Sequence, residues 1–402
     1  MEHRQTDILI AGGGVAGLSA AAVFGAAGFD VICVDPAPPV TAPADPGADL
    51  RTTAFLQPAR DLLDQAGLWP RLAPHATPLQ VMRIVDAGAE TPVTADFDAA
   101  EIGDAPFGWN LPNWLLSREL LARLAELPNV DFRPGTGFAR MLTRDTGAIV
   151  TLSDGAQGRA RLVIAADGRG SPVRQAAGID VTTTRYGQKA VVFAVTHAAP
   201  HANVSTEVHR DGGPFTLVPL PDLDGRPCSS VVWMLPGAEA VALMALEPEA
   251  FAAAASQRSA YVLGHLTLAT PRQIWPIISQ IAGAMVAQRV ALVAEAAHVV
   301  PPIGAQGLNM SLADIACLHG LAVAHPEGLG GPKMLETYAR RRHAEVRMRV
   351  AGVDALNRAS IAGAPGMQAL RALGLKALYG AAPVRRGLMR LGLGARSTTA
   401  RP

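Results

Sequence analysis

The glycine pattern near the N-terminus constrains the fold of this chain more than any other feature. Gly12, Gly14 and Gly17 match G-x-G-x-x-G and follow a short apolar run at residues 7–11. A run of mostly small residues, 18–27, comes next. This order predicts a buried strand, a tight turn and a helix that opens at the glycines.

A carboxylate completes this first unit. A second apolar run, residues 31–34, ends at Asp35, which lies 23 residues after Gly12. An acid at this spacing can accept hydrogen bonds from ribose hydroxyls, and a helix N-terminus offers free N–H groups to phosphates. The pattern does not separate NAD from FAD. It predicts a dinucleotide site whose pyrophosphate lies against Gly12, Gly14, Val15, Ala16 and Gly17.

Two later segments also place a polar turn after an apolar run. Residues 164–174 (Ile-Ala-Ala-Asp-Gly-Arg-Gly-Ser-Pro-Val-Arg) lead into a predicted helix. Residues 293–298 (Val-Ala-Glu-Ala-Ala-His) end another run, and residues 301–310 (Pro-Pro-Ile-Gly-Ala-Gln-Gly-Leu-Asn-Met) open a further helix. The order of the three segments resembles the FAD-dependent aromatic hydroxylases, the class A flavoprotein monooxygenases.

Other segments resemble the ubiquinone-biosynthesis hydroxylase family within that class. They are residues 49–54 (Asp-Leu-Arg-Thr-Thr-Ala), 67–69 (Gly-Leu-Trp), 186–190 (Tyr-Gly-Gln-Lys-Ala) and 338–342 (Tyr-Ala-Arg-Arg-Arg). The likeness spans nearly the whole chain. In one departure, Glu295 stands where the family usually has Asp or Asn, and Ala294 stands where it has Gly. The longer Glu side chain requires a small shift in the ribityl contact and leaves the expected fold unchanged.

The resemblance implies an α/β fold with a Rossmann-like FAD-binding domain of the glutathione-reductase type. An antiparallel β-sheet substrate domain is inserted into it, and a helical segment follows. Strand-like runs at 191–195, 216–220 and 230–234 support the inserted sheet. Residues 53–67, 114–127 and 308–324 have helical patterns, and 82–97 alternates like a strand. The expected boundaries are FAD-binding parts at 1–75, 106–182 and 276–330, substrate-domain strands at 76–105, the antiparallel domain at 183–275 and C-terminal helices at 331–402.

The resemblance also implies contacts between single residues and the cofactor. Asp35 binds the adenosine ribose, and Asp167 orders the loop beside the pyrophosphate. Arg51 and Arg118 contact the ribose, pyrophosphate or ribityl region, because a guanidinium suits phosphate geometry. A solvated helix surface is the alternative for Arg118. Glu295 contacts the ribityl chain. Pro302, Gly304, Gly307, Leu308 and Asn309 lie along the isoalloxazine, where a helix N-terminus stabilises negative charge on the reduced ring.

The implied chemistry belongs to the flavin. NADPH or NADH reduces FAD, O2 forms a flavin C4a-hydroperoxide, and a phenol held above the ring is hydroxylated. The protein must exclude water, because a wet hydroperoxide decays to hydrogen peroxide. No second G-x-G-x-x-G in a strand–helix context is present for a nicotinamide cofactor. This fits a superfamily in which NAD(P)H binds transiently.

The substrate pocket is expected between the flavin loop and the antiparallel sheet. Candidate wall residues are Trp233, Phe215, Pro302 and Asn110, with packing in the sheet core the equal alternative for Trp233 and Phe215. No residue stands out as the base that takes the phenol proton. His298 has apolar neighbours, which favours a structural histidine over a catalytic one. No metal site is predicted, because the other histidines lack ligand spacing.

Composition excludes several other classes of protein. The net charge of +1 predicts no nucleic-acid partner. The three cysteines are far apart and odd in number, which fits a reducing cytosol without a disulfide framework. No signal-peptide pattern is visible, and no run of about 18 uncharged apolar residues suggests a membrane span. We expect a cytoplasmic protein, soluble or peripheral at the inner membrane.

The C-terminal tail is basic and rich in leucine. Residues 357–402 contain no Asp or Glu. A membrane-docking amphipathic helix and a helix that caps the FAD domain fit this composition equally well. The eight basic residues are Arg358, Arg371, Lys376, Arg385, Arg386, Arg390, Arg396 and Arg401; the interleaved apolar residues are Leu370, Leu373, Leu375, Leu378, Leu388, Met389, Leu391 and Leu393.

The leading hypothesis is therefore an FAD-dependent monooxygenase that hydroxylates the ring of a prenylated, lipophilic phenol in ubiquinone biosynthesis. Two enzyme alternatives keep the fold: a hydroxylase of a soluble aromatic acid or antibiotic, and a flavin-dependent isoprenoid reductase. A ubiquinone-biosynthesis complex is an expected partner of such an enzyme. A third alternative is a non-catalytic FAD-binding component of a biosynthetic complex, with Glu295 as its one sequence hint.

Overall fold

The computed structural model describes residues 3–88, 92–210, 212–361 and 382–393. Its first layer is a sheet with the strand order β18-β19-β11-β1-β2-β8. The four central strands and β8 run parallel, and a hairpin of β9 and β10 extends from β11. The strands are β1 (His3–Ala11), β2 (Val31–Asp35), β8 (Val130–Pro134), β9 (Phe138–Arg144), β10 (Gly147–Leu152), β11 (Gln157–Ala165), β18 (Val286–Ala287) and β19 (Val290–Leu292).

Strand register brings the segments that follow these strands to one edge. Ala11, the last residue of β1, pairs with Ala165 of β11 and with Val34 of β2. Ala165 in turn pairs with Leu292 of β19. Because all four strands are parallel, the turns after them leave the sheet side by side, where ligands of open α/β sheets bind.

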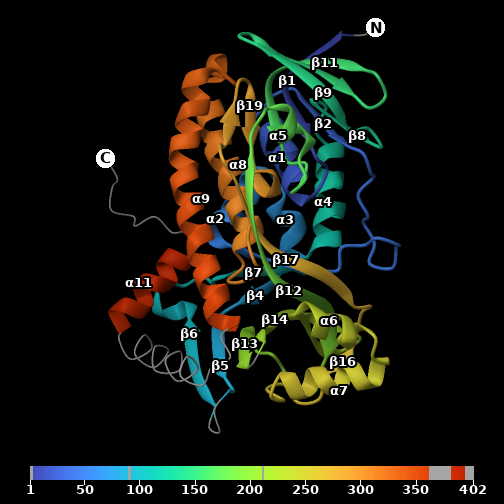
Figure 1. Ribbon diagram of the computed structural model, residues 1–402, viewed down its shortest axis with the longest axis vertical. Coiled ribbons are helices and arrows are strands. Elements are labelled where there is room, and N and C mark those ends of the chain that lie inside the picture. Colours follow the sequence, from blue (N-terminus) through green and yellow to red (C-terminus); the bar gives the residue numbers. More distant parts are fainter. Residues whose placement is uncertain (1–2, 89–91, 211, 362–381, 394–402) are drawn as a thin grey trace.

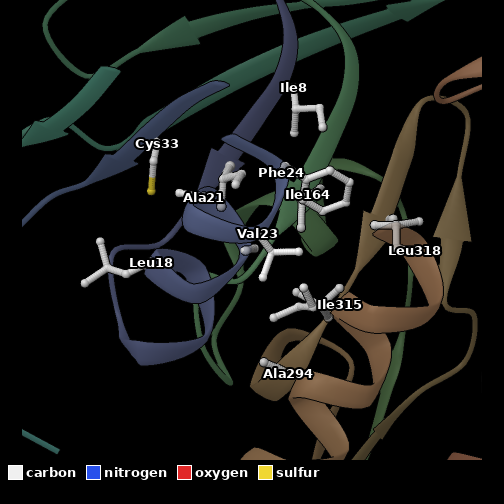
Figure 2. Close-up of a cluster of buried hydrophobic side chains, with 14 of the residues drawn as sticks. Ile8, Leu18, Ala21, Val23, Phe24, Cys33, Ile164, Ala294, Ile315 and Leu318 are labelled. Carbon is white, nitrogen blue, oxygen red and sulfur yellow. The ribbon is translucent and has the colours of Figure 1, made fainter. Parts of the chain in front are cut away.

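Two apolar helices pack together beside this sheet (Figure 1). Helix α1 (Val15–Ala26) is apolar nearly all round because it is buried between the sheet and helix α8 (Gln306–Ala324). Figure 2 shows Phe24 and Val23 of α1 facing Ile315 and Leu318 of α8, all of them buried. Small side chains at 20–22 let α1 approach the sheet closely.

A second, mainly antiparallel sheet forms the other half of the molecule. Its order is β20-β17-β12-β15-β14-β13-β5-β6, with one parallel pair between β13 and β5. Helices α6 (Gly237–Met244) and α7 (Pro248–Arg258) cover one face. The strands are β5 (Val81–Asp86), β6 (Val93–Asp98), β12 (Val181–Thr196), β13 (Val204–Arg210), β14 (Gly213–Leu223), β15 (Arg226–Pro236), β16 (Thr267–Leu268), β17 (Gln273–Ala282) and β20 (His298–Val299).

Short elements connect the two sheets. A small sheet of β3 (Thr52–Leu56), β7 (Gly108–Pro112) and β4 (Thr77–Leu79) lies between them. Around it are helices α2 (Gln57–Gln65), α3 (Trp69–Leu72) and α4 (Asn113–Ala125), and a short α5 (Pro172–Ala176) follows β11. Helix α9 (Pro332–Ile361) runs along both halves, and α11 (Ala382–Leu393) lies near β6.

This arrangement confirms the predicted fold class, with some local errors. The sequence predicts one helix over 53–67, whereas the chain there is strand β3 followed by α2. The first residues pair with distant β7, and the helix begins beside Pro58, which local periodicity does not reveal. Helices α6 and α7 were not predicted, although their Ala-rich sequences favour helix. The predicted domain boundaries stay predictions.

Helix α8 is long and apolar enough to cross a membrane by length and composition, the one such helix among the described residues. Its environment is that of a core helix. It packs against α1, α2 and α9. Its Asp314 is buried and ion-paired inside the protein, which fits packing within the FAD-binding half rather than contact with lipid.

Asp314 of α8 is the centre of a buried polar network that connects α9 to the segment at residues 293–298. It accepts hydrogen bonds from His298 (2.7 Å) and Arg342 (2.8 Å). Burial opposes its charge, but His298 and Arg342 outweigh that effect and lower the pKa of Asp314. Tyr338 of α9 donates to the Leu292 carbonyl at 2.7 Å. His298 therefore has the packing and pairing of a structural histidine.

Replacing Arg342 with Met should destabilise the protein by about 3–5 kcal/mol, because Asp314 keeps its burial and loses a cationic partner. The free energy of unfolding from urea titration at pH 7 measures this loss. Because the pKa of Asp314 is lowered, the network's contribution is complete above the ordinary carboxylate pKa of about 4 and disappears as pH falls below it. Arg341→Met, an exposed neighbour on α9, is the control. Equal stabilities of the two variants would contradict the network's role.

Candidate functional site

The first glycine turn is shaped by backbone contacts that exclude side chains. Gly12 has φ of +111°, and a Cβ there would meet the Ala166 carbonyl oxygen at 2.2 Å. A Cβ at Gly17 would meet the Gly12 carbonyl oxygen at 1.9 Å. At Gly14, by contrast, an added Cβ would meet nothing within 4 Å. The first and third glycines thus serve the fold, and the space at Gly14 lies before the N-terminus of α1, where N–H groups are free to bind an anion.

Asp35 ends β2 beside this turn. Its Oδ2 accepts from the Gly13 N–H at 2.5 Å, and its Oδ1 accepts from the Ala37 N–H at 2.8 Å. Each carboxylate oxygen retains acceptor capacity for a further donor. The carboxylate is therefore fixed next to the glycine turn in an orientation that suits ribose hydroxyls.

Asp167 follows β11 on the other side of β1. Its Oδ2 accepts from the Val173 N–H at 3.0 Å. Its Oδ1 is buried and has no hydrogen-bond partner within the described residues. Burial raises the pKa of Asp167, although hydrogen bonds from Ser171 and Val173 counteract part of that effect. An unpaired buried oxygen is costly, so this position favours a donor from a bound ligand.

Arg51 is held by a carboxylate and an aromatic ring. Its guanidinium makes two hydrogen bonds to Asp49, at 2.8 and 2.7 Å, and lies 4.4 Å from the centre of the Trp275 ring. Asp49 also accepts from Asn113 at 2.9 Å. Burial opposes the Arg51 charge, but Asp49 and then Glu295 outweigh it and raise the Arg51 pKa. Arg51 of the segment after β2 is thus within electrostatic reach of the third motif.

The predicted cofactor contacts of Glu295 and Arg118 stay predictions, and the two residues have different surroundings. Glu295 is exposed and lies 3.9 Å from Arg169 of the second motif. Its neighbour Ala294 has φ of +57°, a conformation that glycine adopts more easily, which explains the family's Gly there. Arg118 pairs with Glu119 on α4 and lies over Trp114. Its contact with a cofactor stays a prediction.

The loop at residues 301–309 leads into α8 and is fixed to β3. Asn309 accepts from the Leu56 N–H at 2.9 Å and donates to the carbonyls of Ala54 (2.7 Å) and Ala305 (2.6 Å). Gly304 and Ala305 both have positive φ, +63° and +56°, immediately before the helix. The loop therefore lies against β3 through Asn309 and against the antiparallel sheet through Ile303, just before α8 begins.

Comparison with known proteins identifies the family. Residues 5–353 match the family model described as FAD binding domain. The ubiquinone hydroxylase UbiL of Rhodospirillum rubrum is 34% identical over 399 residues, which cover 97% of this chain and 90% of that protein. The chain belongs to the ubiquinone hydroxylase family of FAD-binding proteins. Within it, the 3-demethoxyubiquinol 3-hydroxylase of Escherichia coli is 28% identical over 98% of this chain and 100% of its own length.

Solved structures agree with this fold. The p-nitrophenol 4-monooxygenase PnpA from Pseudomonas putida DLL-E4 has a TM-score of 0.81 at 21% identity, covering 99% of this chain and 100% of its own. PqsL of P. aeruginosa, in a complex with 2-aminobenzoylacetate, has a TM-score of 0.76 at 23% identity over 93% and 100% of the two chains. These likenesses confirm the FAD-binding monooxygenase fold.

The residues at the carboxyl edge of the parallel sheet in this chain are suited to hold FAD. The open space at Gly14 and the unpaired Oδ1 of Asp167 lie after neighbouring strands, next to the carboxylate of Asp35. Arg51 and Glu295 approach from the next segments. The chain is an FAD-dependent monooxygenase, and NAD(P)H is the reductant typical of its family. The individual contacts, including those of Val15, Ala16, Gly307 and Leu308, stay predictions.

Two of the predicted pocket residues, Phe215 and Trp233, pack in a core of the antiparallel sheet. Phe215 and Trp233 pack edge to face, with ring centres 5.4 Å apart, in the core that contains Phe251 of α7. Alternation then places their neighbours Val232 and Met234 on the opposite face, where Ile303 of the 301–309 loop packs. The sheet-core alternative is therefore correct for Phe215 and Trp233.

The other two pocket candidates remain at the junction of the sheets. Asn110 is buried and donates to the Pro219 carbonyl at 2.9 Å, while its Oδ1 has no partner in the described part of the chain. Pro302 is exposed on the 301–309 loop. Their role as pocket walls stays a prediction.

Sequence reasoning missed several supporting residues. Gln273 donates to the Ala48 carbonyl at 2.8 Å and so holds the Arg51 segment against β17. Arg174 is buried and donates to the carbonyls of Ala296 (2.8 Å) and Arg169 (2.9 Å), joining the second motif to the third. Asp49, two positions before Arg51, was the one such residue visible as a local charge pair. The remaining contacts depend on long-range packing.

Gly14→Ala should leave folding intact and weaken FAD binding, because the space beside Gly14 is open in the protein and is the predicted position of the pyrophosphate. The apo protein should keep the melting temperature of the wild type, while the Kd for FAD rises at least about tenfold, or 1.4 kcal/mol. Gly103→Ala, also in open space but on a distant turn, is the control. Flavin-fluorescence titration gives the Kd. Unchanged FAD affinity in Gly14→Ala would contradict the assigned pyrophosphate position.

Proposed function

We propose that this chain hydroxylates the aromatic ring of a prenylated phenol in ubiquinone biosynthesis, with NAD(P)H and O2 as co-substrates. The observation that carries the proposal is the meeting of three flavin motifs at one sheet edge, in a chain related over 97% of its length to a ubiquinone hydroxylase. The E. coli and Xenopus tropicalis relatives are also named for ubiquinone biosynthesis.

The bound FAD would activate O2, and the residues of this chain would position the phenol and keep water out. The sheet face toward the 301–309 loop is apolar: Ala190, Val192, Met234 and Ile277 are buried there beneath Ile303. An apolar wall suits a lipophilic ring, and a dry site prevents loss of the activated oxygen to water. Trp275 at its border links this wall to Arg51.

Membrane contact and a place in a biosynthetic complex belong to the proposal as well. Helix α11 packs one face on the protein: Met389 is buried with Ala99 and Phe107, and Arg385 pairs with Glu101 at 2.7 Å. Arg390 and Val384 are exposed, and exposed Arg386 also lies 3.9 Å from Glu101. A prenylated substrate resides in a bilayer, so docking of Arg386 and Arg390 on anionic lipid would bring the enzyme to it. The tail residues at 370–378 and 394–402 lie outside the described residues.

Purified, FAD-loaded protein should oxidise NADPH or NADH faster when a short-chain 2-prenylphenol is added. O2 uptake and a product heavier by one oxygen atom should accompany this stimulation, as measured with an oxygen electrode and mass spectrometry. Soluble aromatic acids serve as comparison substrates. NAD(P)H oxidation without oxygen uptake would indicate an isoprenoid reductase, and bound FAD without any stimulation would indicate a non-catalytic complex member. Either result would overturn the proposal.

The double variant Arg386→Gln, Arg390→Gln should bind anionic vesicles more weakly, by about 2 kcal/mol or roughly 30-fold, at low salt. Co-sedimentation with phosphatidylglycerol vesicles measures this, and added salt should release the wild type. Arg340→Gln, Arg341→Gln, with two exposed arginines of α9, is the matched control. Equal binding by both double variants would contradict docking through α11.

A further inference from the structure

A histidine–glutamate pair lies on β13, outside the cofactor site. His209 Nε2 is 2.6 Å from a carboxylate oxygen of Glu207. The pair is mostly buried, with side-chain exposures of 12% for His209 and 24% for Glu207. The second ring nitrogen, His209 Nδ1, is fully buried and has no hydrogen-bond partner in the part of the chain that is described. A buried nitrogen without a partner is costly unless a ligand completes it.

The two side chains point to the face of the sheet opposite α6 and α7. Val208, between them, is buried in the core with Phe215 and Phe251, on the helix-covered face. Side chains alternate along a strand, so Glu207 and His209 share the other face. That is also the face where Ile303 of the 301–309 loop packs.

The pairing of strands β13, β14 and β15 places His209 in line with Met234, which lies closer to Arg51. His209 pairs with Pro214, and Phe215 next to Pro214 pairs with Trp233 next to Met234. Neighbouring strands lie about 4.8 Å apart, so His209 lies roughly 10 Å from Met234 across two strands. Met234 pairs with Ala190, and Ala190 with Trp275, whose ring lies against Arg51. A phenol ring bound over Met234 would lie between His209 and the predicted cofactor position beside Arg51.

The hydrogen bond sets the chemistry of the imidazole. In neutral His209, Nε2–H donates to Glu207, and Nδ1 is left as a proton acceptor. On the same face, β5 contributes the carboxylate of Asp86, which pairs with His209. Strand β14 contributes Pro214 and Thr216, neither of which is titratable. Arg258 of α7 reaches the Gly213 carbonyl at the end of the neighbouring strand. The pair is thus arranged to take one proton and to stabilise the resulting imidazolium.

We infer that His209, oriented by Glu207, is the base that removes the phenol proton of the substrate. The inference rests on the proposed function and adds the residue that sequence reasoning could not name. The phenol O–H bond breaks, its electron pair stays on oxygen, and the proton passes to His209 Nδ1. The phenolate ring is then more electron-rich at the carbon to be hydroxylated, and Glu207 balances the imidazolium charge.

The test is a pH titration of the phenolate absorbance of a short-chain 2-prenylphenol bound to the FAD-loaded protein. In the wild type, phenolate should form near neutral pH, well below the value of about 10 for a free phenol. His209→Gln should still bind the phenol and FAD but show phenolate only near pH 10. Glu207→Gln, which keeps the imidazole, should fall between the two. His265→Gln, an exposed histidine on another segment, is the control and should match the wild type.

Turnover gives a second measurement. His209→Gln should lower kcat about 10²- to 10⁴-fold, the usual contribution of a general base, with little change in KM. Identical phenolate titrations in the wild type and His209→Gln would overturn the assignment while leaving the hydroxylase proposal intact. Failure of the wild type to bind the prenylphenol would overturn both. A rise in KM alone would assign His209 to packing and overturn its role as base.

Discussion

The carboxyl edge of the parallel sheet is the constraint on which the rest of the structure depends. Strands β19, β11, β1 and β2 are neighbours. The last residues of β19, β11 and β1 pair with one another, and Ala11 of β1 also pairs with Val34 near the end of β2. Four segments that are far apart in sequence therefore leave the sheet within a few strand spacings of one another. Gly12 enforces this geometry, because its turn touches the backbone after β11 too closely for a Cβ. Cofactor binding follows from that alignment of strand ends.

Buried contacts outside the predicted cofactor site hold the carboxyl edge of the parallel sheet in place. Asp314 and Arg342 join α8 and α9 beneath the third motif, and Arg174 joins the second motif to the third. These are buried charge-assisted contacts, so loss of Arg342 leaves the Asp314 carboxylate in the core with one cationic partner fewer. The left-handed Ala294, where the family has Gly, shows that this chain tolerates local strain at the same point. Glu295, next to it, is exposed and lies 3.9 Å from Arg169 of the second motif.

The sequence predicted those features that depend on local pattern. Gly12 and Gly17 shape the predicted tight turn, because backbone geometry near a strand end restricts residue type. Asp35 lies beside that turn, and its ribose contact stays a prediction. The sequence left Phe215 and Trp233 equally compatible with a pocket or a core. Alternating side chains along a strand show that the two faces of the sheet differ, but not which face lies toward the cofactor. The Glu207–His209 pair carried no recognisable spacing. Strand register places the pair on the sheet face opposite α6 and α7, together with Met234. Register depends on long-range pairing and cannot be read from local sequence.

A crystal structure of the protein grown with FAD and refined with the cofactor present tests the central claim most directly. We expect one FAD per chain, with the pyrophosphate against residues 12–17, the adenosine ribose at Asp35 and the isoalloxazine beside residues 302–309. Unpaired Oδ1 of Asp167 should then have a partner contributed by the cofactor or by water bound to it. An FAD bound away from the carboxyl ends of β1, β11 and β19, or no FAD at saturating concentration, would contradict the account.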